Sequence, residues 1–476
     1  MSSRSLQSSA IWRLLEVIGG EATAFLVFAV LARLLVPEHF GAVALATSVI
    51  LLCQVLVYHG ALESLIQIPG FEPRHFQAAT AANLVVGVAL VVLVTLLAWP
   101  LGLVLEREEF AIILIAMLPI LLVRAVTTPM LAVVRRQMDF KAVAVRTLVA
   151  VCSGGAVAIA LAAEGAGVWA LVAQQWTNEL VGMLMLAWRS PHKPWQLRWD
   201  RAALDDLRPV ALPVTGANLA SAVARRLDIF AIGLRLGDTS VGIYFMVSRL
   251  VFAMQMLTQY GLGEVAMVVM CKLRPAIERP WTEISAVLRL AAWPTFMLFG
   301  LMAIIGPSLV PLVFGAAWEP ATMPMALYAA FSPAGAIVGL IGVALVSAGN
   351  AEGFQRLSIV VAFVQLVAIF VAAAWGLMAV VAAIGVVQVL SVPYALSHLR
   401  RTEQIGWSTL LRRLGPIVVV YLACFVPSAL VVLQHPEMDW LVGKVFLAVG
   451  AVLGVLLLRR DWKTVTAALA QARPPG

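Results

Sequence analysis

The sequence predicts an all-α polytopic membrane protein with about fourteen transmembrane helices, arranged as two six-helix lobes and two extra C-terminal helices. Composition is the first indication: the 476 residues are 62% hydrophobic and only 12% charged, whereas a soluble domain carries about 25% charged residues. The second is the length of the apolar runs, because about 20 apolar residues cross a bilayer as a helix. These runs do not alternate apolar and polar residues as the strands of a membrane β-barrel do.

The third indication is an internal repeat of polar and glycine residues at one offset. The pairs are Gly41 and Gly242, Gln54 and Gln255, Gly60 and Gly261, and Glu63 and Glu264. In each pair the numbers differ by 201, as in 242 − 41, and such coincidences are rare in an apolar chain. Six predicted spans fit into this offset. Because six is even, we expect two parallel repeats about an axis along the membrane normal.

The apolar runs divide the chain into spans with short connections. The predicted spans cover roughly residues 11–35, 39–67, 75–99, 110–135, 138–163, 166–188, 204–235, 239–270, 282–312, 320–348, 354–374, 376–398, 409–433 and 440–459. Residues 1–190 would form the first lobe and residues 204–400 the second, joined by a cytoplasmic linker at 191–203. The extra helices fall in 401–460, and a cytoplasmic tail follows at 461–476.

The placement of charge predicts the orientation. The net charge of +8 is concentrated in connections on one side of the membrane, and the opposite side has little beyond Arg33, Arg107 and Arg235. An excess of Lys and Arg marks the cytoplasmic side, so we expect both termini in the cytoplasm. The first span lacks the short apolar region and cleavage site of a signal peptide, and we expect it to be retained. Charge confined to membrane loops also argues against a nucleic-acid partner.

No pattern of an enzyme or a cofactor site is present. The four cysteines, Cys53, Cys152, Cys271 and Cys424, fall in apolar spans without ligand-like spacing, so we expect buried thiols and neither a disulfide nor a metal. The sequence has no nucleophile motif, Walker A motif or dinucleotide-binding fingerprint. Its connections of about ten residues are too short to present catalytic groups. We therefore expect no enzyme activity and no cofactor.

Ionised side chains in the seventh and eighth spans indicate the functional site. A charge near the bilayer centre costs about 2.5–3.5 kcal/mol on insertion scales, so such residues usually face protein or water and mark function. Asn218, Ser221, Arg225 and Asp228 are spaced by three and four residues and share one helical face. Arg226 points away from that face.

An ion pair between Asp228 and Arg249 is geometrically reasonable, because both lie at similar depth on either side of the turn at residues 236–239. Two interpretations remain open. The pair either only locks two helices together, or it orients them and leaves Arg225 available for substrate. An unpaired arginine in a cavity suits phosphate, since its planar fork matches the oxygens.

Further charged residues extend the set of candidates. Arg124, in the middle of the fourth span, either faces the central cavity or reaches Glu164 or Glu179 only by a large movement. His59 and Glu63 either relay protons or simply interact, and the second is favoured because Tyr260 replaces the histidine in the repeat. The candidate substrate-binding residues are Arg225, Arg249, Asp228, Asn218, Arg226, Arg13 and Arg124. The candidate cation-coupling residues are Glu16, Glu21, Glu63 and Glu264.

Several segments resemble one membrane-protein family. They are LARLLVPEHFGAVALA with GALESLIQ after it, RRQMDF, GVWALVAQQ, ARRLDIFAIGLRLGDTSVGIYFMVSRL and PLVFGAAWEPA. In this order, over roughly residues 10–400, the chain resembles bacterial polysaccharide exporters of the MOP (MATE-like) flippase superfamily, most closely the Wzx-type exporters. That family shows Arg, two residues and Asp on the seventh span, which Arg225 and Asp228 match, and Arg249 matches its arginine on the eighth. The doubled Arg225–Arg226 departs from the family pattern.

The resemblance implies two lobes around a central cavity in the bacterial cytoplasmic (inner) membrane. It implies movement of an undecaprenyl-diphosphate-linked oligosaccharide from the cytoplasmic to the periplasmic leaflet by alternating access, with membrane lipids, polysaccharide polymerase and export machinery as further partners. The first alternative is a cation-coupled multidrug exporter of the same superfamily, which should favour carboxylates and aromatics over arginines. The second is a structural scaffold or polymerase partner, which would not need buried charges on helix faces.

Overall fold

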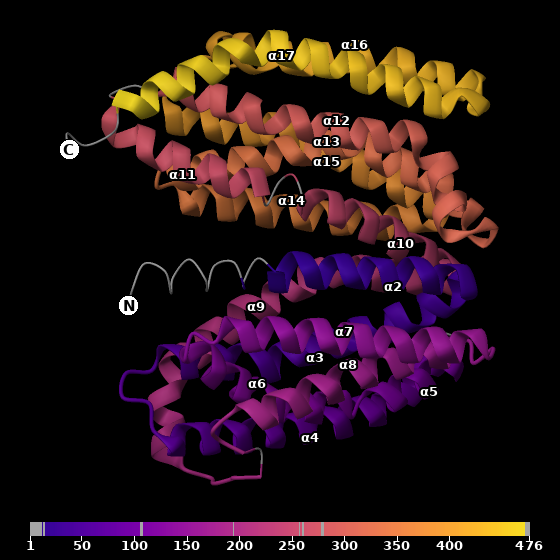
Figure 1. Cartoon of the computed structure of the whole chain (residues 1–476), viewed down its shortest axis with the longest axis vertical. Coiled ribbons are helices and arrows are strands. Elements are labelled where there is room, and N and C mark those ends of the chain that lie inside the picture. The colour runs from indigo at the N-terminus through magenta and orange to yellow at the C-terminus, as the bar shows by residue number, and fades with distance from the viewer. Residues whose placement is uncertain are drawn as a thin grey trace. The chain divides into compact units, whose positions relative to one another are not determined.

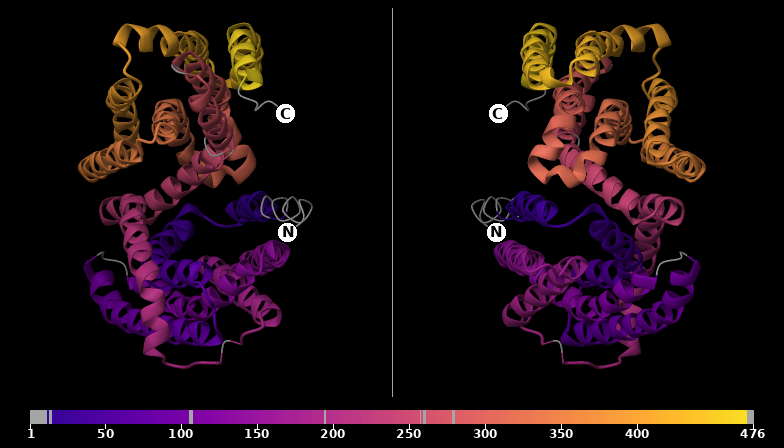
Figure 2. Two further views of the ribbon diagram at one scale, coloured as in Figure 1. Left: turned by 90° about the vertical axis from the view of Figure 1, so that its left-hand side faces the viewer. Right: turned by 90° about the vertical axis from the view of Figure 1, so that its right-hand side faces the viewer.

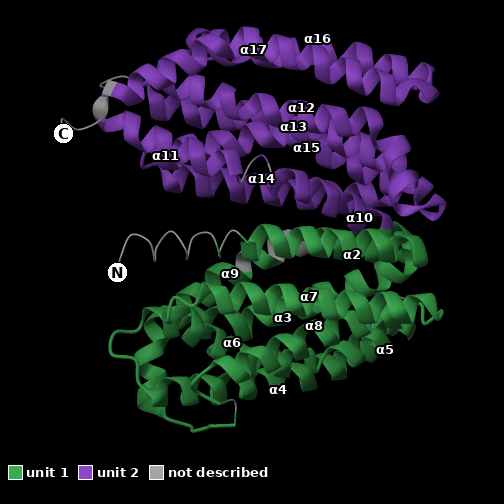
Figure 3. Cartoon of the chain, viewed as in Figure 1, with its two compact units in different colours: residues 1–242 green, residues 243–476 purple. Residues whose placement is uncertain are grey.

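The computed structural model describes residues 12, 15–104, 108–193, 195–256, 258, 261–277 and 280–471 (Figure 1). Within these ranges the regular structure is helical and contains no strand. The contacts divide the chain into two compact units, Met1–Gly242 and Ile243–Gly476 (Figure 3). The predicted all-α class is confirmed. The division into repeats at residues 191–203 stays a prediction, and the first contact unit also includes the helix that follows this linker.

The first unit is built around α3. Its elements are η1 (Leu15–Gly19), α2 (Gly20–Leu34), α3 (Pro37–Gln67), α4 (Pro73–Val104), α5 (Glu108–Met117), α6 (Ile120–Arg136), α7 (Phe140–Ala163), α8 (Val168–Arg189) and α9 (Arg201–Leu236). Helix α3 contacts α4, α5, α6, α8 and α9, while α7 packs against α2 and α8. Leu65, Phe76 and Met130 are fully buried in one hydrophobic cluster of this unit. Apolar side chains from α3, α4 and α6 therefore hold it together.

The second unit is built around α12 and α13, and Figure 2 shows the helices of each unit from two sides. Its elements are α10 (Asp238–Gln255), which begins in the first unit, α11 (Gly261–Ala276), α12 (Trp281–Phe314), η3 (Ala316–Ala321), α13 (Thr322–Ser347), α14 (Ala351–Ala372), η4 (Ala373–Trp375), α15 (Leu377–Glu403), α16 (Trp407–Gln434), η5 (Pro436–Met438) and α17 (Asp439–Gln471). Helix α12 contacts α13, α16 and α17, and α13 contacts α15. The two C-terminal helices thus belong to this unit.

Each of the fourteen predicted spans coincides with one helix or with two consecutive helices. Among the described residues, eleven helices are long and apolar enough to cross a membrane. The predicted spans 166–188, 204–235 and 239–270 are not in that set. Polar residues such as Gln174 and Glu179 lower the hydropathy of α8, and α10 and α11 divide the last of these spans. The count of fourteen therefore stays a prediction.

Polar caps begin three helices at the end predicted to be cytoplasmic. The Asp139 carboxylate accepts a hydrogen bond from the Ala142 amide at 3.0 Å at the start of α7. Asn350 Oδ1 accepts from the Gly353 amide at 2.9 Å at the start of α14, and Asp200 caps α9 in the same way. Each cap satisfies a backbone N–H that has no partner within the helix.

In each unit, one of these cap residues also bonds to a residue at the end of the next long helix. Asp139 accepts a hydrogen bond from Arg189 Nε, at the end of α8, at 2.8 Å. Asn350 Nδ2 donates to Thr402 Oγ1, near the end of α15, at 2.8 Å. In both units the cap of one helix is thus bonded to the end of the next long helix, which supports the predicted duplication.

Helix α17 is attached to α12 by an ion pair and by glycines. Arg289 Nε lies 2.7 Å from Asp461 Oδ2, and the two side chains are only 12% and 10% exposed. Trp293 Nε1 donates to the Gly450 carbonyl at 3.2 Å, and a Cβ on Gly454 would overlap the Trp293 ring. Small residues let two helix backbones approach closely. Helix α17 continues to Gln471, beyond the predicted end at residue 459.

The cysteines are only partly as predicted. Cys53 and Cys424 are half-buried, whereas Cys152 and Cys271 are exposed, so the expectation of four buried thiols is wrong. On a membrane helix an exposed apolar side chain faces lipid instead of water, and periodicity alone does not separate the two environments. The described residues contain no group of three or more His, Cys, Asp or Glu that could hold a metal ion.

Candidate substrate site

The predicted site on α9 and α10 is described only in part. The side chains of Ser221, Arg225 and Arg226 lie outside the described residues, although their backbone belongs to α9, and Arg13 lies outside them altogether. The roles predicted for these residues stay predictions.

The described members of that site are half-buried. Asn218 Nδ2 donates to the Val214 carbonyl at 2.8 Å, and Asp228 accepts from the Ile229 amide at 2.7 Å. Arg249 is half-buried on α10. Because Asp228 and Arg249 belong to different units, their pairing stays a prediction.

Arg124 is held inside the first unit by hydrogen bonds to two other helices. It lies on α6, and its Nε donates to Glu179 Oε1 on α8 at 3.0 Å. Its Nη1 donates to Gln54 Oε1 on α3 at 2.8 Å. The expectation that Arg124 reaches Glu179 only by a large movement is wrong, because α6 and α8 pack directly against each other. Glu179 and Gln54 are only 7% and 6% exposed, so this guanidinium is held by two buried acceptors.

Arg124 also lines a cavity inside the first unit. The cavity has a volume of about 240 Å³ and is lined by Leu51, Gln54, Val55, Tyr58, His59, Arg124 and Ala222. Successive turns of α3 supply Gln54, Tyr58 and His59, because residues four apart lie on the same face of a helix. The wall therefore combines a guanidinium, an amide, a phenol and an imidazole, all of which donate hydrogen bonds to oxygen anions.

A second arginine, Arg146, lies close to the Arg124–Glu179 pair. Arg146 Nε on α7 lies 3.5 Å from the Gly182 carbonyl on α8, and a Cβ on Gly182 would lie 2.7 Å from Arg146 Nη2. Arg146 interacts electrostatically with Glu179 and with Arg124. Arg124 thus pairs with the buried Glu179 carboxylate and Arg146 interacts with it electrostatically, so the cluster carries a net positive charge when all three groups are ionised. Sequence reasoning missed Arg146, although its distance from the cap at Asp139 places it about two turns inside α7.

The candidate cation-coupling residues lie on several helices, three of them in the first unit and Glu264 in the second. Glu16 lies 3.6 Å from Arg135, and Glu21 is exposed in the first turn of α2. Glu63 is half-buried on α3, and Glu264 is exposed on α11. Their coupling role stays a prediction.

Contacts with α4 hold the inter-lobe linker and the first turns of α9 in place within the first unit. His75 Nε2 lies 3.2 Å from Asp206 Oδ2 on α9, and the His192 ring in the linker stacks on Phe76 with ring centroids 5.1 Å apart. Burial in this contact lowers the pKa of His192 below its usual value of 6.5, because desolvation disfavours the charged imidazolium. The linker therefore packs with a neutral histidine.

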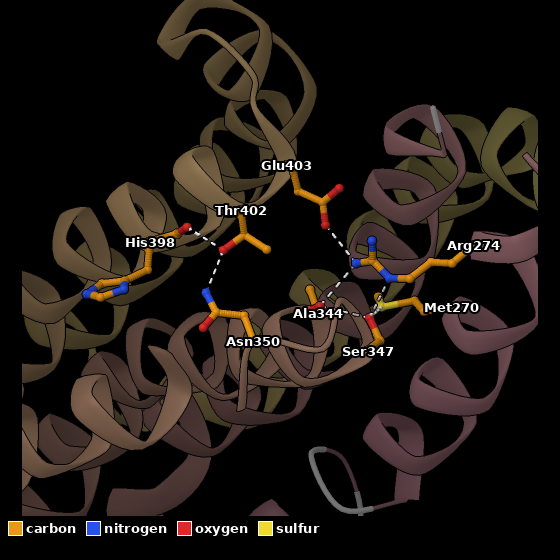
Figure 4. A network of polar contacts seen from close by, with 8 residues as sticks. All are labelled: Met270, Arg274, Ala344, Ser347, Asn350, His398, Thr402 and Glu403. Carbon is orange, nitrogen blue, oxygen red and sulfur yellow. Dashed lines mark hydrogen bonds and ion pairs between the residues drawn. The ribbon is translucent and has the colours of Figure 1, made fainter. Parts of the chain in front are cut away.

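A polar network in the second unit joins the ends of three helices (Figure 4). Arg274 on α11 donates from Nη2 to Glu403 Oε1 at 2.7 Å and to the Ala344 carbonyl at 3.1 Å. In the first unit, Arg136 donates to the Ile66 carbonyl at 2.9 Å, at the end of α3. Both arginines satisfy carbonyls at helix C-termini, so we assign them to structure and exclude them from the substrate site.

Comparisons with known proteins agree with this architecture. The succinoglycan biosynthesis transport protein ExoT of Rhizobium meliloti (strain 1021) is 25% identical over 338 residues, which are 69% of this chain and 66% of that protein. The match therefore spans slightly less than two thirds of that relative.

Two solved structures share the fold. The lipid II flippase MurJ, in an inward closed conformation, has a TM-score of 0.70 and 10% identity, covering 94% of this chain and 99% of that one. An inward-facing multidrug resistance MATE family transporter of the MOP superfamily has a TM-score of 0.55 and 15% identity, covering 81% and 96%. The fold is therefore that of MOP-superfamily transporters. Residues 30–323, more than half of the chain, match the family described as polysaccharide biosynthesis protein, and the chain belongs to that family.

Proposed function

We propose that this protein is a flippase that moves polyprenyl-diphosphate-linked oligosaccharide repeat units across the bacterial inner membrane, from the cytoplasmic to the periplasmic leaflet. Family membership and the transport role named for the succinoglycan relative support the polysaccharide pathway. The fold shared with a lipid II flippase supports a transporter of this architecture. The relatives compared above are a transport protein, a flippase and a transporter, so the proposal includes no enzyme activity.

The observation on which the proposal rests is the Arg124 cavity. Moving a diphosphate through a low-dielectric layer is costly unless positive groups offset its charge. Arg124 lines a cavity, and Arg146 adds a second positive charge beside the same carboxylate. A planar guanidinium binds phosphate oxygens in a bidentate manner. This cluster is therefore suited to an anionic head group and unsuited to a cationic drug.

In the proposed mechanism the substrate phosphate competes with Glu179 for Arg124. While the cavity is empty, Glu179 and Gln54 hold the guanidinium in place. An arriving diphosphate takes over some of these hydrogen bonds, and Arg225 serves as a further phosphate ligand. A phosphate-binding role for Arg249, which lies in the second unit, is a separate part of the proposal. The oligosaccharide occupies hydrated space, the prenyl tail stays in lipid, and the lobes rock in alternation. A cytoplasmic location of both termini belongs to this proposal.

Deletion and complementation test the proposal. A strain lacking the gene should lose its surface or secreted polysaccharide and accumulate lipid-linked repeat units, and the wild-type gene should restore both. Arg124→Ala should fail to restore export while the protein still accumulates in the membrane. Arg412→Ala is the matched control, because Arg412 is exposed on α16. Normal polysaccharide export combined with new sensitivity to cationic drugs would instead select the multidrug exporter.

A further inference from the structure

We propose that a groove between α12 and α17 binds an anionic glycerophospholipid from the surrounding leaflet. The groove has a volume of about 640 Å³ and lies entirely within the second unit. It is lined by Leu290, Trp293, Ala451, Gly454, Val455, Leu458, Arg459, Trp462 and Lys463. This inference is independent of the transport function proposed above, since the groove contains none of the residues assigned to the substrate.

The floor of the groove is formed where the small residues Ala451 and Gly454 of α17 pack against the Trp293 ring of α12. Gly454 has no side chain, and a Cβ there would overlap Trp293 Nε1. The Trp293 ring is only 5% exposed and is held by its hydrogen bond to the Gly450 carbonyl at 3.2 Å. Ala451 continues this small-residue face one turn earlier. The hollow is therefore a stable part of the helix packing, shaped to receive an apolar chain.

The walls separate an apolar end from a basic end. Val455 and Leu458 contribute hydrocarbon, whereas Arg459 and Lys463 stand one turn apart at the far end. Residues 451–463 of α17 span about 18 Å at 1.5 Å per residue. Half of a hydrocarbon core is about 15 Å thick, so the groove has the length of one leaflet. Trp462 is 63% exposed beside the basic pair, as expected of a tryptophan at the membrane interface.

The basic end of the groove is not neutralised by a carboxylate of the described residues. Asp461 is the nearest carboxylate in sequence, but it points inward and is paired with Arg289 at 2.7 Å. Neither Arg459 nor Lys463 has a carboxylate partner among the described residues. Basic residues that flank an apolar groove at the cytoplasmic end of membrane helices attract anionic lipid head groups. A phospholipid whose acyl chain lies along α17 and whose phosphate lies at Arg459 and Lys463 matches both ends of the groove.

Lipid binding to the purified full-length protein tests this inference. Phosphatidylglycerol is titrated into detergent-solubilised protein and binding is measured by native mass spectrometry, with phosphatidylcholine as the zwitterionic comparison. The expected result is preferential binding of phosphatidylglycerol. The double variant Arg459→Gln with Lys463→Gln should bind it about 30-fold more weakly, since each basic residue contributes about 1 kcal/mol and 1.4 kcal/mol is tenfold.

Two controls separate the groove from general charge attraction. Arg401→Gln with Arg412→Gln removes the same charge from two exposed positions of the second unit and should leave binding unchanged. Ala451→Trp fills the groove while keeping both basic residues, and it should weaken binding in a protein that remains monodisperse.

Three results would overturn the inference. The first is equal binding of phosphatidylcholine and phosphatidylglycerol. The second is equal loss of binding in the two double variants. The third is unchanged phosphatidylglycerol binding in Ala451→Trp together with lost polysaccharide export, which would assign the groove to the prenyl tail of the substrate.

Discussion

Gly41 and Gly242, which are 201 positions apart, face each other with backbone against backbone. A Cβ on Gly41 would overlap the carbonyl oxygen of Asp238, and a Cβ on Gly242 would overlap that of Pro37. These two contacts are reciprocal, because Pro37 and Asp238 are also 201 positions apart. A twofold relation between duplicated segments requires such reciprocity.

The close contact of Gly41 with Gly242, called the glycine crossing below, is accompanied by a polar contact between residues that are also 201 positions apart. Thr239 Oγ1 donates to Glu38 Oε1 at 2.9 Å, and 239 − 38 is again 201. The turns before the repeated glycines thus meet each other in the first unit. This arrangement explains why glycine is needed at both positions, since only glycine allows this close an approach.

Substitution at this crossing should destabilise the protein. Gly41→Ala and Gly242→Ala should each lower stability by about 1–3 kcal/mol, the usual cost of overpacking. Their effects should be less than additive in the double variant, because both act on one contact. Thermal unfolding of the detergent-purified variants measures this.

Gly216→Ala is the matched control for the crossing. Gly216 is an exposed helical glycine of α9 with open space around it, so alanine there should be neutral or stabilising by about 0.5–1 kcal/mol. Unfolding temperatures of Gly41→Ala and Gly216→Ala that do not differ would refute the close contact.

Substitutions at the Arg124–Glu179 pair should change protein stability and polysaccharide export in different ways. Removing one partner of a buried ion pair costs about 3–5 kcal/mol, so Arg124→Gln and Glu179→Gln should each unfold at lower temperature. The double variant should be more stable than either single variant, since neither charge is stranded. Export should nevertheless stay lost in the double variant if Arg124 binds phosphate. Export restored by the double change would make the pair purely structural.

His192 should make the stability of the linker contact depend on pH. Its folded pKa is lowered below 6.5 by burial, so the neutral form packs on Phe76. This contribution is complete above pH 6.5 and is lost as the pH falls through 6.5 and the lowered folded pKa. His192→Phe keeps the ring and removes the titration. The drop in unfolding temperature between pH 7.5 and 5.5 should therefore be smaller in this variant, and an equal drop would contradict the assignment.

The Arg289–Asp461 pair should fasten α17 to the second unit. Asp461→Ala leaves Arg289 buried without its carboxylate and should cost about 3–5 kcal/mol. Arg289→Met with Asp461→Leu should recover most of the loss, because apolar residues replace both charges. The protease resistance of α17 in detergent measures the effect. Equal resistance of Asp461→Ala and wild type would show that glycine packing alone holds this helix.

Much of the fold was predictable because apolar length and polar caps are local signals. The apolar run that begins at residue 354 predicted α14. The Asn350 side chain caps the start of this helix by accepting a hydrogen bond from the Gly353 amide. The end of α17 was not predictable in the same way. Residues 461–476 were predicted to be a cytoplasmic tail, but Asp461 lies within α17 and turns inward to meet Arg289. The two residues of this contact are 172 positions apart in the sequence, and the local pattern of apolar residues cannot predict a contact over that separation.

The candidate site was predictable only as a set of residue types. An arginine inside an apolar span identified Arg124 as important. Its partners depend on the packing of α3, α6 and α8, so Gln54 was noted only as part of the internal repeat and Glu179 was placed out of reach. Arg146 was missed although it lies inside the predicted span 138–163. The carboxylate with which it interacts, Glu179, lies on another helix and comes near only because α7 packs against α8.

Flipping in proteoliposomes tests the central claim most directly. Purified protein is reconstituted with a fluorescent polyprenyl-diphosphate-linked oligosaccharide, and a membrane-impermeant quencher reports which leaflet holds the label. The wild type should make both leaflets accessible, whereas Arg124→Ala and Arg225→Ala, folded and inserted to the same level, should not. Transport by Arg412→Ala should equal that of the wild type. No movement of the lipid-linked oligosaccharide by the wild type, with active export of a cationic dye from the same vesicles, would contradict the account.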